Sequence, residues 1–281
     1  MKKPTGLVLA FNGAALLIAL ASGAAVLRSV FVPDEMAPCS TRYGHGTQLA
    51  LERAPGDLLT AADLQARFGG TDWGLLDNAR VVEIKGNSAR QAIEVRLAKT
   101  SAEAGSADPR IGMGFTWMPK GMGQPAAACL AYSVLLPPGF DFAKGGRLPG
   151  LLATAQSTNT AALGSSFRSG WADNGGLEVR VQGPGWSDAR PLASNRRDYI
   201  FPRGQWVALE QEIVLNTPGQ KDGALRVWAD GALQFEKNGL VLRDNPDVRI
   251  SSVAAEAAAY GAGAVAREKK LWFSALELQW Q

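Results

Sequence analysis

Apolar and polar residues alternate with a period of two along most of the chain beyond about residue 80, which is typical of half-buried β-strands. Successive side chains of a strand point to opposite faces, so one face of each run enters a core. The pattern predicts strands at 81–84, 93–97, 112–118, 128–136, 175–182, 206–215, 225–229 and 271–280. In the last of these we expect a single strand with Trp272 and Leu276 on one face and Phe273 on the other.

Local turn and capping signals agree with this pattern. Gly86-Asn87 and Asp230-Gly231 each separate two strand-like runs and are two-residue hairpin signals. Thr60 followed by Asp63 can cap a short helix that ends near residue 68. With no internal repeat and no long helix beyond the N-terminal segment, we expect an all-β fold, an antiparallel two-sheet β-sandwich of jelly-roll type.

Composition limits the classes of partner. The 281 residues suffice for one β domain, and 32 glycines and 15 prolines fit a turn-rich protein. The net charge of +3 comes from Lys2, Lys3 and Arg28, because the chain from residue 34 onward has 26 basic and 26 acidic residues. A near-neutral chain has no general attraction to nucleic acid, so any anion must be recognised by a local cluster of basic side chains.

Residues 1–33 have the build of an export segment. Lys2 and Lys3 precede the uncharged stretch 6–27, and Ala19-Leu20-Ala21 offers a cleavage site. The same stretch is long enough to span a bilayer, so a cleaved signal peptide and a retained signal anchor both stay open. We expect an exported protein, whether periplasmic, secreted or anchored to the outer face of the inner membrane, that meets the membrane only through this segment.

We expect residues 34–56, rich in small and polar side chains, to form a linker, and residues 57–281 to form the β domain. Cys39 and Cys129 could pair in an oxidising compartment, but Cys129 also fits a small buried residue of an apolar strand, which we slightly favour. Two cysteines and one histidine argue against a structural zinc site. We expect no metal, no cofactor and a monomer.

The segment 131–151, AYSVLLPPGFDFAKGGRLPGL, joins an alternating strand to a Gly/Pro-rich bend that presents one cation, Arg147. The motif GGRLPGL resembles the segment GGKLPGL of polysaccharide lyase family 14, the alginate and glucuronan lyases. The motif SSFR at 165–168 resembles the family's S-x-R strand, and LEVRVQ at 177–182 aligns with its E-V-Y-x-Y strand. The resemblance continues through 201–231 and the aromatic strand LWFSALEL, and so extends from about residue 75 to the end of the chain.

The resemblance implies β-elimination at a uronic acid, in which a cation neutralises the carboxylate, a base removes the C5 proton and an acid protonates the leaving oxygen. The family assigns this work to a lysine, an arginine and two tyrosines. Position by position, the lysine becomes Arg147, the S-x-R pair is retained as Ser166 and Arg168, and the two tyrosines are replaced by Arg180 and Gln182.

Strand geometry explains how these positions could form one site. Residues two apart in a strand share a face, so the expected polar rows are Ser166 with Arg168, and Glu178 with Arg180 and Gln182. Two such rows plus Arg147 would line a cationic groove that grips uronate carboxylates. Arg180 and Gln182 also suit an ordinary solvated face, and Arg147 also suits a cation that only bonds the carbonyls of its bend.

The loss of both family tyrosines leaves the proton transfer open, because arginine rarely gives up a proton and Gln182 cannot titrate. Other groups that could do this work are Tyr132, Tyr199, Tyr260 and His45. We favour Tyr199, since Arg196 and Arg197 beside it would lower the pKa of its phenol.

Trp171 and Trp186 flank glycine-rich loops, where each could stack on a sugar ring or pack locally. We therefore expect a lyase acting on an acidic polysaccharide such as alginate or glucuronan. The expected catalytic residues are Arg147, Ser166, Arg168 and Tyr199, and the expected substrate-binding residues are Trp171, Glu178, Arg180 and Gln182. The alternatives are a carbohydrate-binding relative that has lost the catalytic tyrosines, and a hydrolase, which would need a second carboxylate facing Glu178.

Overall fold

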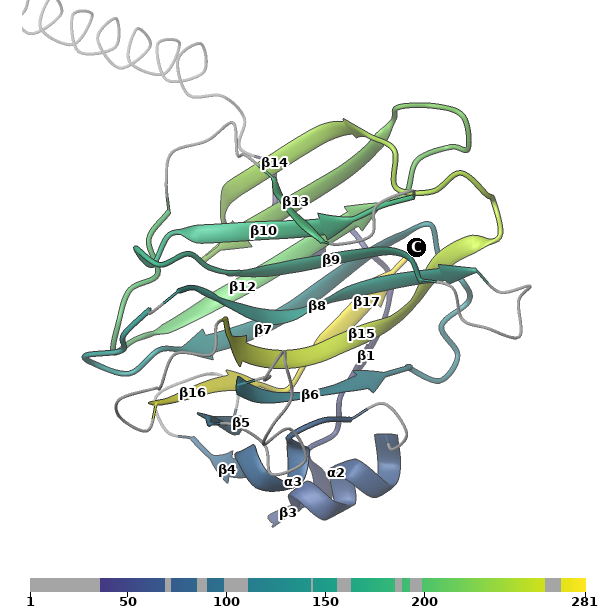
Figure 1. Ribbon diagram of the computed structural model, residues 1–281. Coiled ribbons are helices and arrows are strands. Elements are labelled where there is room, and N and C mark those ends of the chain that lie inside the picture. The colour runs from purple at the N-terminus through teal and green to yellow at the C-terminus, as the bar shows by residue number, and fades with distance from the viewer. Residues whose placement is uncertain are drawn as a thin grey trace, which may run out of the picture. The chain divides into compact units, whose positions relative to one another are not determined.

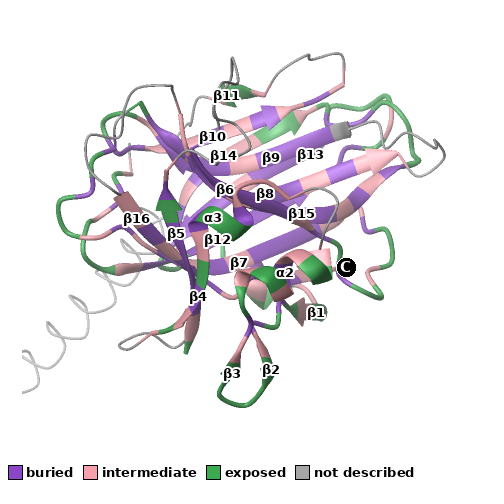
Figure 2. Cartoon of the chain, turned by 60° about the horizontal axis from the view of Figure 1, so that its bottom comes forward, coloured by how far each residue is buried: buried purple, intermediate pink, exposed green. Residues whose placement is uncertain are grey.

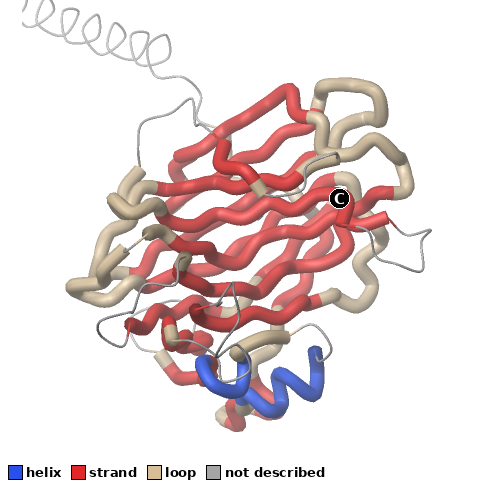
Figure 3. The backbone as a smooth tube through the Cα atoms, in the orientation of Figure 1, coloured by secondary structure: helices blue, strands red, loops and turns tan. Residues whose placement is uncertain are grey.

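The structure is a computed structural model that describes residues 36–68, 72–84, 90–98, 111–142, 144–155, 163–184, 189–192, 199–260 and 269–281. Strands dominate these ranges, as Figure 3 shows in red, so the predicted all-β class is confirmed. No helix within them is long and apolar enough to cross a membrane. The expected export segment, residues 1–33, lies outside them.

Two antiparallel sheets make up most of the fold (Figure 1). The larger sheet contains β1 (His45–Gln48), β4 (Ala79–Glu83), β5 (Gln91–Leu97), β7 (Ala127–Leu135), β12 (Trp206–Val214), β13 (Gly223–Ala229), β14 (Ala232–Leu240), β16 (Lys269–Ser274) and β17 (Glu277–Trp280). Seven of its strands follow the order β14-β13-β12-β7-β16-β5-β4, and β17 pairs with both β7 and β1.

The smaller sheet has the order β11-β10-β9-β8-β15-β6. Its strands are β6 (Ile111–Trp117), β8 (Gly146–Ala155), β9 (Leu163–Trp171), β10 (Leu177–Gln182), β11 (Arg190–Leu192) and β15 (Val248–Ala259). The remaining elements are the 3₁₀ turn η1 (Cys39–Thr41), the hairpin of β2 (Glu52–Ala54) and β3 (Asp57–Leu58), and the helices α2 (Ala61–Phe68) and α3 (Leu75–Asn78).

One apolar core joins the two sheets, and Figure 2 shows its buried strands in purple. Leu130 and Val134 of β7 enter it from the larger sheet, while Phe167 of β9 and Val179 of β10 enter it from the smaller one. Burying each such side chain contributes roughly 2 kcal/mol. The alternation therefore leaves the neighbouring residues of β9 and β10 on the outer face of the smaller sheet.

Two local predictions are confirmed. Thr60 and Asp63 cap α2 reciprocally, since the Thr60 N–H donates to Asp63 at 2.8 Å and the Asp63 N–H donates to Thr60 Oγ1 at 3.2 Å. The Thr60 hydroxyl, which donates to the Asp63 carboxylate at 2.6 Å, and the Thr60 N–H together lower the pKa of the Asp63 carboxyl. Asp230 and Gly231 both have positive φ, 49° and 80°, as a tight β13–β14 hairpin turn requires.

The segment expected to be a linker, 34–56, is built into the fold from Pro38 onward. His45 of β1 pairs with Trp280 of β17, and Arg42 lies 2.9 Å from the buried carboxylate of Glu212. Tyr43 donates a hydrogen bond to that carboxylate at 2.6 Å. The small and polar composition of this segment suits an edge strand as well as a linker, and its partners lie far away in the sequence.

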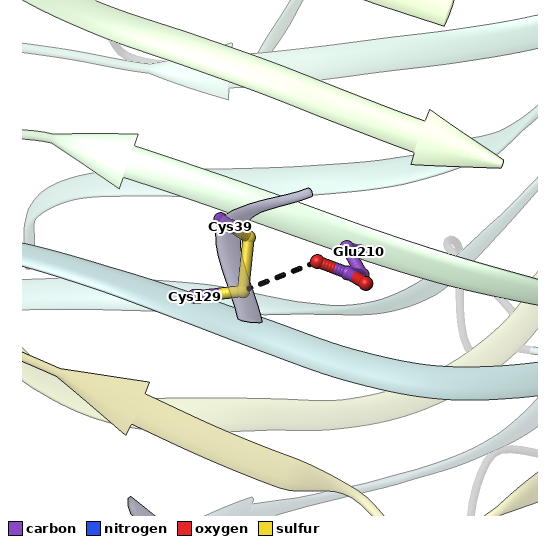
Figure 4. Close-up of side chains that lie close together, drawn as sticks. All are labelled: Cys39, Cys129 and Glu210. Carbon is purple, nitrogen blue, oxygen red and sulfur yellow. Dashed lines mark hydrogen bonds between the residues drawn. A yellow bond between two sulfur atoms is a disulfide. The ribbon is translucent and has the colours of Figure 1, made fainter. Parts of the chain in front are cut away.

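Cys39 and Cys129 form a disulfide, with Cα atoms 5.7 Å apart, so the slightly favoured alternative of an unpaired Cys129 is wrong. Figure 4 shows the bond beside Glu210, whose Oε2 lies 3.8 Å from the Cys129 sulfur. Glu210 also accepts hydrogen bonds from the N–H and hydroxyl of Ser40, both at 2.9 Å. Within the described ranges these two cysteines and Glu210 are the one group close enough to hold a metal ion, but their sulfurs are bonded to each other.

Replacing both cysteines with alanine should lower the free energy of unfolding by about 2–5 kcal/mol, because the cross-link restricts the unfolded chain across a separation of 90 residues. Urea unfolding followed by tryptophan fluorescence measures this loss. Reduced wild-type protein should unfold at the same urea concentration as the double variant. A double variant as stable as the oxidised protein would contradict the role of the cross-link.

Candidate active site

Arg147 projects from strand β8, and the bend predicted for GGRLPGL is wrong. The pairing of β8 with β9 is regular up to Arg147 and resumes at Gly150, which faces Arg168. Pro149 lies in this irregular step, where its missing N–H removes no ladder hydrogen bond. A β-bulge therefore lets a Gly/Pro-rich motif continue as a strand inside the sheet.

The bulge of β8 is held from the core side by polar groups of the larger sheet. The carbonyl of Pro149 accepts hydrogen bonds from Gln211 Nε2 at 2.7 Å and from the Tyr132 hydroxyl at 3.2 Å. Gln211 Nε2 also donates to the Tyr132 hydroxyl at 2.8 Å. Tyr132 is buried, which raises the pKa of its phenol, so this candidate for proton transfer has a structural place between the sheets instead.

Replacing Tyr132 with phenylalanine should lower the free energy of unfolding by about 1–3 kcal/mol, because buried partners would lose hydrogen bonds. The raised pKa of this phenol also means that the protonated form stabilises the fold. That contribution is fully present below the unfolded-state value of about 10 and is lost as the pH rises above it. Denaturation of both proteins between pH 7 and 11 should show a smaller alkaline loss in the variant.

Tyr199 provides a matched control for this substitution. Its hydroxyl is buried and has no hydrogen-bond partner among the residues that the structure describes, so Tyr199→Phe should leave the stability unchanged or slightly higher. Equal stability losses for the two variants would contradict the role given to the Tyr132 hydroxyl.

Arg168 of β9 and Arg180 of β10 lie directly opposite each other on paired strands. Their neighbours Phe167 and Val179 point into the core, so both arginine side chains lie on the outer face of the smaller sheet. Arg147 of β8, the next strand, reaches the same cluster through a shared carboxylate, described next. We call Arg147, Arg168 and Arg180 the arginine row.

Glu256 of β15 links two members of the arginine row. Its Oε2 lies 3.1 Å from Arg147 Nε and 3.2 Å from Arg168 Nε. All three atoms are buried, and the contacts lack the alignment of hydrogen bonds, so they are ion pairs at close range. The sequence reasoning missed Glu256, because it is one charged residue within an alanine-rich run.

A tryptophan supports the row at its β6 side. Trp73 pairs with Gly114 of β6 through two backbone hydrogen bonds of 2.9 Å. The Arg147 guanidinium carbon lies 5.5 Å from the centre of the Trp73 ring, within cation–π range. A Cβ atom at Gly114 would come within 2.6 Å of Trp73 Nε1 and 2.8 Å of Glu256 Cγ, so the glycine makes room for both side chains.

Tyr260 brings a phenol to the arginine row. It directly follows β15 and is four residues beyond Glu256. Its N–H donates to the Gly145 carbonyl at 2.9 Å. The Arg180 guanidinium carbon lies 5.2 Å from the centre of its ring. Burial raises the pKa of the Tyr260 phenol, and the charges of the three arginines oppose this rise. Tyr260 is therefore close to the whole row and stays protonated at neutral pH.

Glu178 and Gln182 complete the polar row on β10. Glu178 accepts a hydrogen bond from Arg180 at 2.9 Å, which ties the two side chains together. Gln182 lies opposite Ser166 of β9, as the expected strand faces require. Ser166, however, is fully buried, and its hydroxyl has no hydrogen-bond partner within the described part of the chain, so it lies beneath the surface of the row.

Tyr199, the favoured proton-transfer residue, lies in a different electrostatic environment. Burial and the charge of Asp230 raise the pKa of Tyr199 to about 12, which contradicts the expected lowering. Its ring packs edge-on against Phe201 at 5.4 Å. Arg196 and Arg197, on which the expectation depended, lie outside the described residues.

Two other expectations fail to place residues at the row. Trp171 is only 1 % exposed, and its indole N–H donates to the Phe142 carbonyl at 3.2 Å, so stacking on a sugar ring is excluded and local packing is correct. His45 lies in β1 of the other sheet, beside a hollow of about 410 Å³. That hollow is lined by Tyr43, Gly44, His45, Gly46, Thr47, Gln48, Glu277 and Gln279. Trp186, the second stacking candidate, lies outside the described residues.

The family model Polysaccharide lyase 14 matches residues 85–182 and 187–263, which is more than half of the chain. The chain belongs to the polysaccharide lyase 14 family. The predicted resemblance is thereby confirmed, and the matched ranges of this polysaccharide lyase 14 protein include the arginine row, Glu256 and Tyr260. No curated protein sequence matches the chain.

Solved structures share the fold of this family member. The PL-14 alginate lyase from Aplysia kurodai is 19% identical with a TM-score of 0.62, over 85% of this chain and 99% of that one. An alginate lyase in complex with an alginate trisaccharide is 12% identical with a TM-score of 0.63, over 84% and 98%. The glucuronan lyase from the fungus Trichoderma reesei is 11% identical with a TM-score of 0.50, over 76% and 90%. At these identities the likeness shows the fold.

Proposed function

We propose that this protein is a lyase that cleaves a uronate-containing polysaccharide, such as alginate or glucuronan, by β-elimination. The observation that carries the proposal is the gathering of three guanidinium groups and one phenol on a single face of the smaller sheet. Membership of the polysaccharide lyase 14 family supports the reaction class. Structural neighbours described as alginate and glucuronan lyases support the choice of polymers.

The arginine row would bind the carboxylate of the uronate that reacts. Guanidinium groups hold a carboxylate through paired charge-assisted hydrogen bonds, which draws negative charge away from the sugar ring. The C5 proton next to a neutralised carboxylate is more acidic, and the row also stabilises the charge that develops when this proton leaves. Arg147 here takes the place of the family's lysine, as a fixed charge that does not give up its proton.

Tyr260 would donate the proton that the leaving group needs. As the C4–O4 bond breaks, O4 takes the phenolic proton, while the electrons of the C5–H bond form the C4–C5 double bond. A protonated phenol cannot also accept the C5 proton, so a second group must do so. Oε2 of Glu256 already lies between two guanidinium groups, so we assign this acceptor role to Glu178, beside Arg180.

The second candidate function is a carbohydrate-binding protein without activity, and the replacement of the Y-x-Y pair by Arg180 and Gln182 favours it. A third, hydrolysis, gains a second carboxylate at the row, Glu256, which the sequence reasoning lacked. We further propose that the protein acts as a monomer outside the cytoplasm. The apolar segment 6–27 and the Cys39–Cys129 disulfide support this location.

One assay separates these functions. The full chain is incubated with alginate, polyglucuronate and other uronate polymers while the absorbance of the unsaturated product is followed. Rising absorbance supports elimination. Retardation in an affinity gel without product supports the binding protein, and new reducing ends without the absorbance support hydrolysis. If the chain cleaves none of these polymers and is retarded by none of them in the gel, the proposed function is contradicted.

A further inference from the structure

Glu256 occupies an unusual place, between two cations that the proposed function needs for substrate. One of its oxygens contacts the Nε atoms of both Arg147 and Arg168. Its side chain is 15 % exposed, while those of the two arginines are 27 % and 19 % exposed. The carboxylate is thus the more enclosed partner in a contact that the polysaccharide itself would compete for.

The fold constructs this contact from several features. The pairing of β15 with β8 shifts register between Ala254 and Ala258, and Glu256 lies at the centre of that step. It faces the irregular step of β8 that follows Arg147. On its other side Glu256 pairs with Gly114, whose missing side chain leaves room for it. Two facing irregularities and a glycine therefore place one carboxylate between two arginines.

The geometry of a guanidinium group allows it to serve two carboxylates. Its five N–H donors form separate edges, one containing Nε and one formed by the two terminal nitrogens. Glu256 contacts the Nε atoms of both arginines, which leaves the terminal edges for an external carboxylate. The ring of Trp73 restricts Arg147 from another side. The two guanidinium groups are thereby held in one arrangement before any substrate arrives.

We infer that Glu256 is a positioning residue, which fixes Arg147 and Arg168 as a fork for a uronate carboxylate. This inference rests on the proposed function. A fixed fork raises the turnover rate, because correct placement of charges is most effective in the transition state. The negative charge of Glu256 also repels a uronate, so it weakens binding of the substrate in its ground state. Glu256 therefore lowers the affinity for the substrate in its ground state but holds the two guanidinium groups where the transition state needs them.

Replacing Glu256 with glutamine tests both effects in one variant. Glutamine keeps the size but removes the charge, so both arginines lose the ionic attraction to the one oxygen that they share. We expect kcat to fall about 100-fold as the fork loosens. We expect KM to fall about threefold to fivefold at low salt, because one repulsive charge is gone. A residue with only a structural role would lower kcat through loss of folded protein and leave KM unchanged.

The substitution Gly114→Ala separates geometry from charge. The backbone at Gly114 is not in the left-handed region, but the added methyl group would press on Trp73 and on Glu256. We expect kcat to fall as in the glutamine variant while KM does not fall, since the carboxylate remains. Glu256→Asp should likewise restore the wild-type KM. The control for the change in net charge is Glu83→Gln, because Glu83 is an exposed residue of β4 in the other sheet. This variant should have the wild-type kcat and KM.

The outcomes distinguish a failure of the positioning role of Glu256 from a failure of the proposed function on which that role rests. If the wild-type chain neither binds nor cleaves any uronate polymer, the proposed function itself is wrong. Cleavage by the wild type with unchanged kcat and KM in Glu256→Gln, or with a higher KM, overturns the positioning role alone. If the wild type binds without cleaving, affinity electrophoresis in polyuronate replaces KM. Glu256→Gln must then be retarded more strongly than wild type, and equal or weaker retardation overturns the role.

Discussion

Replacing Arg168 with alanine should lower kcat/KM on a polyuronate about 100-fold to 1,000-fold, the loss typical of removing one charge-stabilising donor. Arg168 lies in the middle of the row, opposite Arg180 and joined to Arg147 through Glu256. Its loss removes a cation and also leaves the Glu256 carboxylate with one arginine fewer. That carboxylate then repels the uronate, so KM should rise and kcat should fall.

Two further variants sharpen this prediction. Arg168→Lys keeps the charge but loses the planar guanidinium group and its paired N–H donors, so it should recover only part of the lost activity. Arg53→Ala is the matched control, because Arg53 is an exposed arginine of the β2–β3 hairpin that pairs with Asp57. Its activity should equal that of wild type. An Arg168→Ala variant that is folded and cleaves at the wild-type rate would remove this residue from the site.

Replacing Tyr260 with phenylalanine should lower kcat about 100-fold to 10,000-fold and leave KM nearly unchanged, because the ring stays over Arg180 while the donated proton is lost. The pH profile provides a second readout. Because burial raises the pKa of this phenol, the proton is present through neutral pH, and kcat should fall only as the pH rises above the usual range of tyrosine. The variant should lack this alkaline decrease.

Tyr199→Phe is the matched control for proton transfer. Tyr199 is the residue that the sequence favours, its hydroxyl is buried, and burial together with the charge of Asp230 raises its pKa. We expect wild-type kcat and an unchanged pH profile. The reverse result, an inactive Tyr199→Phe beside an active Tyr260→Phe, would assign the proton transfer to Tyr199 instead of Tyr260.

Much of the fold follows from local pattern. Seven of the eight strands predicted from the period of two lie within about two residues of an observed strand, because one face of each enters a single core, but no strand was predicted at β8 or β15. It failed where the chain changes phase. The expected strand 271–280 is two strands, since Phe273 and Leu276 are both buried, and Trp272 lies on the outer face, where its indole donates to Glu94 at 3.1 Å. Alternation alone cannot show such a step.

Sequence reasoning named the three cations of the row, and Tyr260 as one of four candidates for proton transfer, but it missed Glu256. Arg147, Arg168 and Arg180 could be found because a motif marks each one. Glu256 and Tyr260 could not be assigned in the same way, because their roles come from a strand that is distant in sequence but pairs with β8. Composition also cannot tell a bend from a bulge, and only the register of β8 with its neighbours explains how Pro149 sits within a strand.

The most direct test of the arginine row is a crystal structure of the Tyr260→Phe variant with trisaccharides of mannuronate, guluronate or glucuronate. We predict a uronate carboxylate within about 3 Å of guanidinium nitrogens of the row, on the outer face of the smaller sheet. A trisaccharide bound instead in the hollow beside β1 and β17, with the row untouched, would contradict the account.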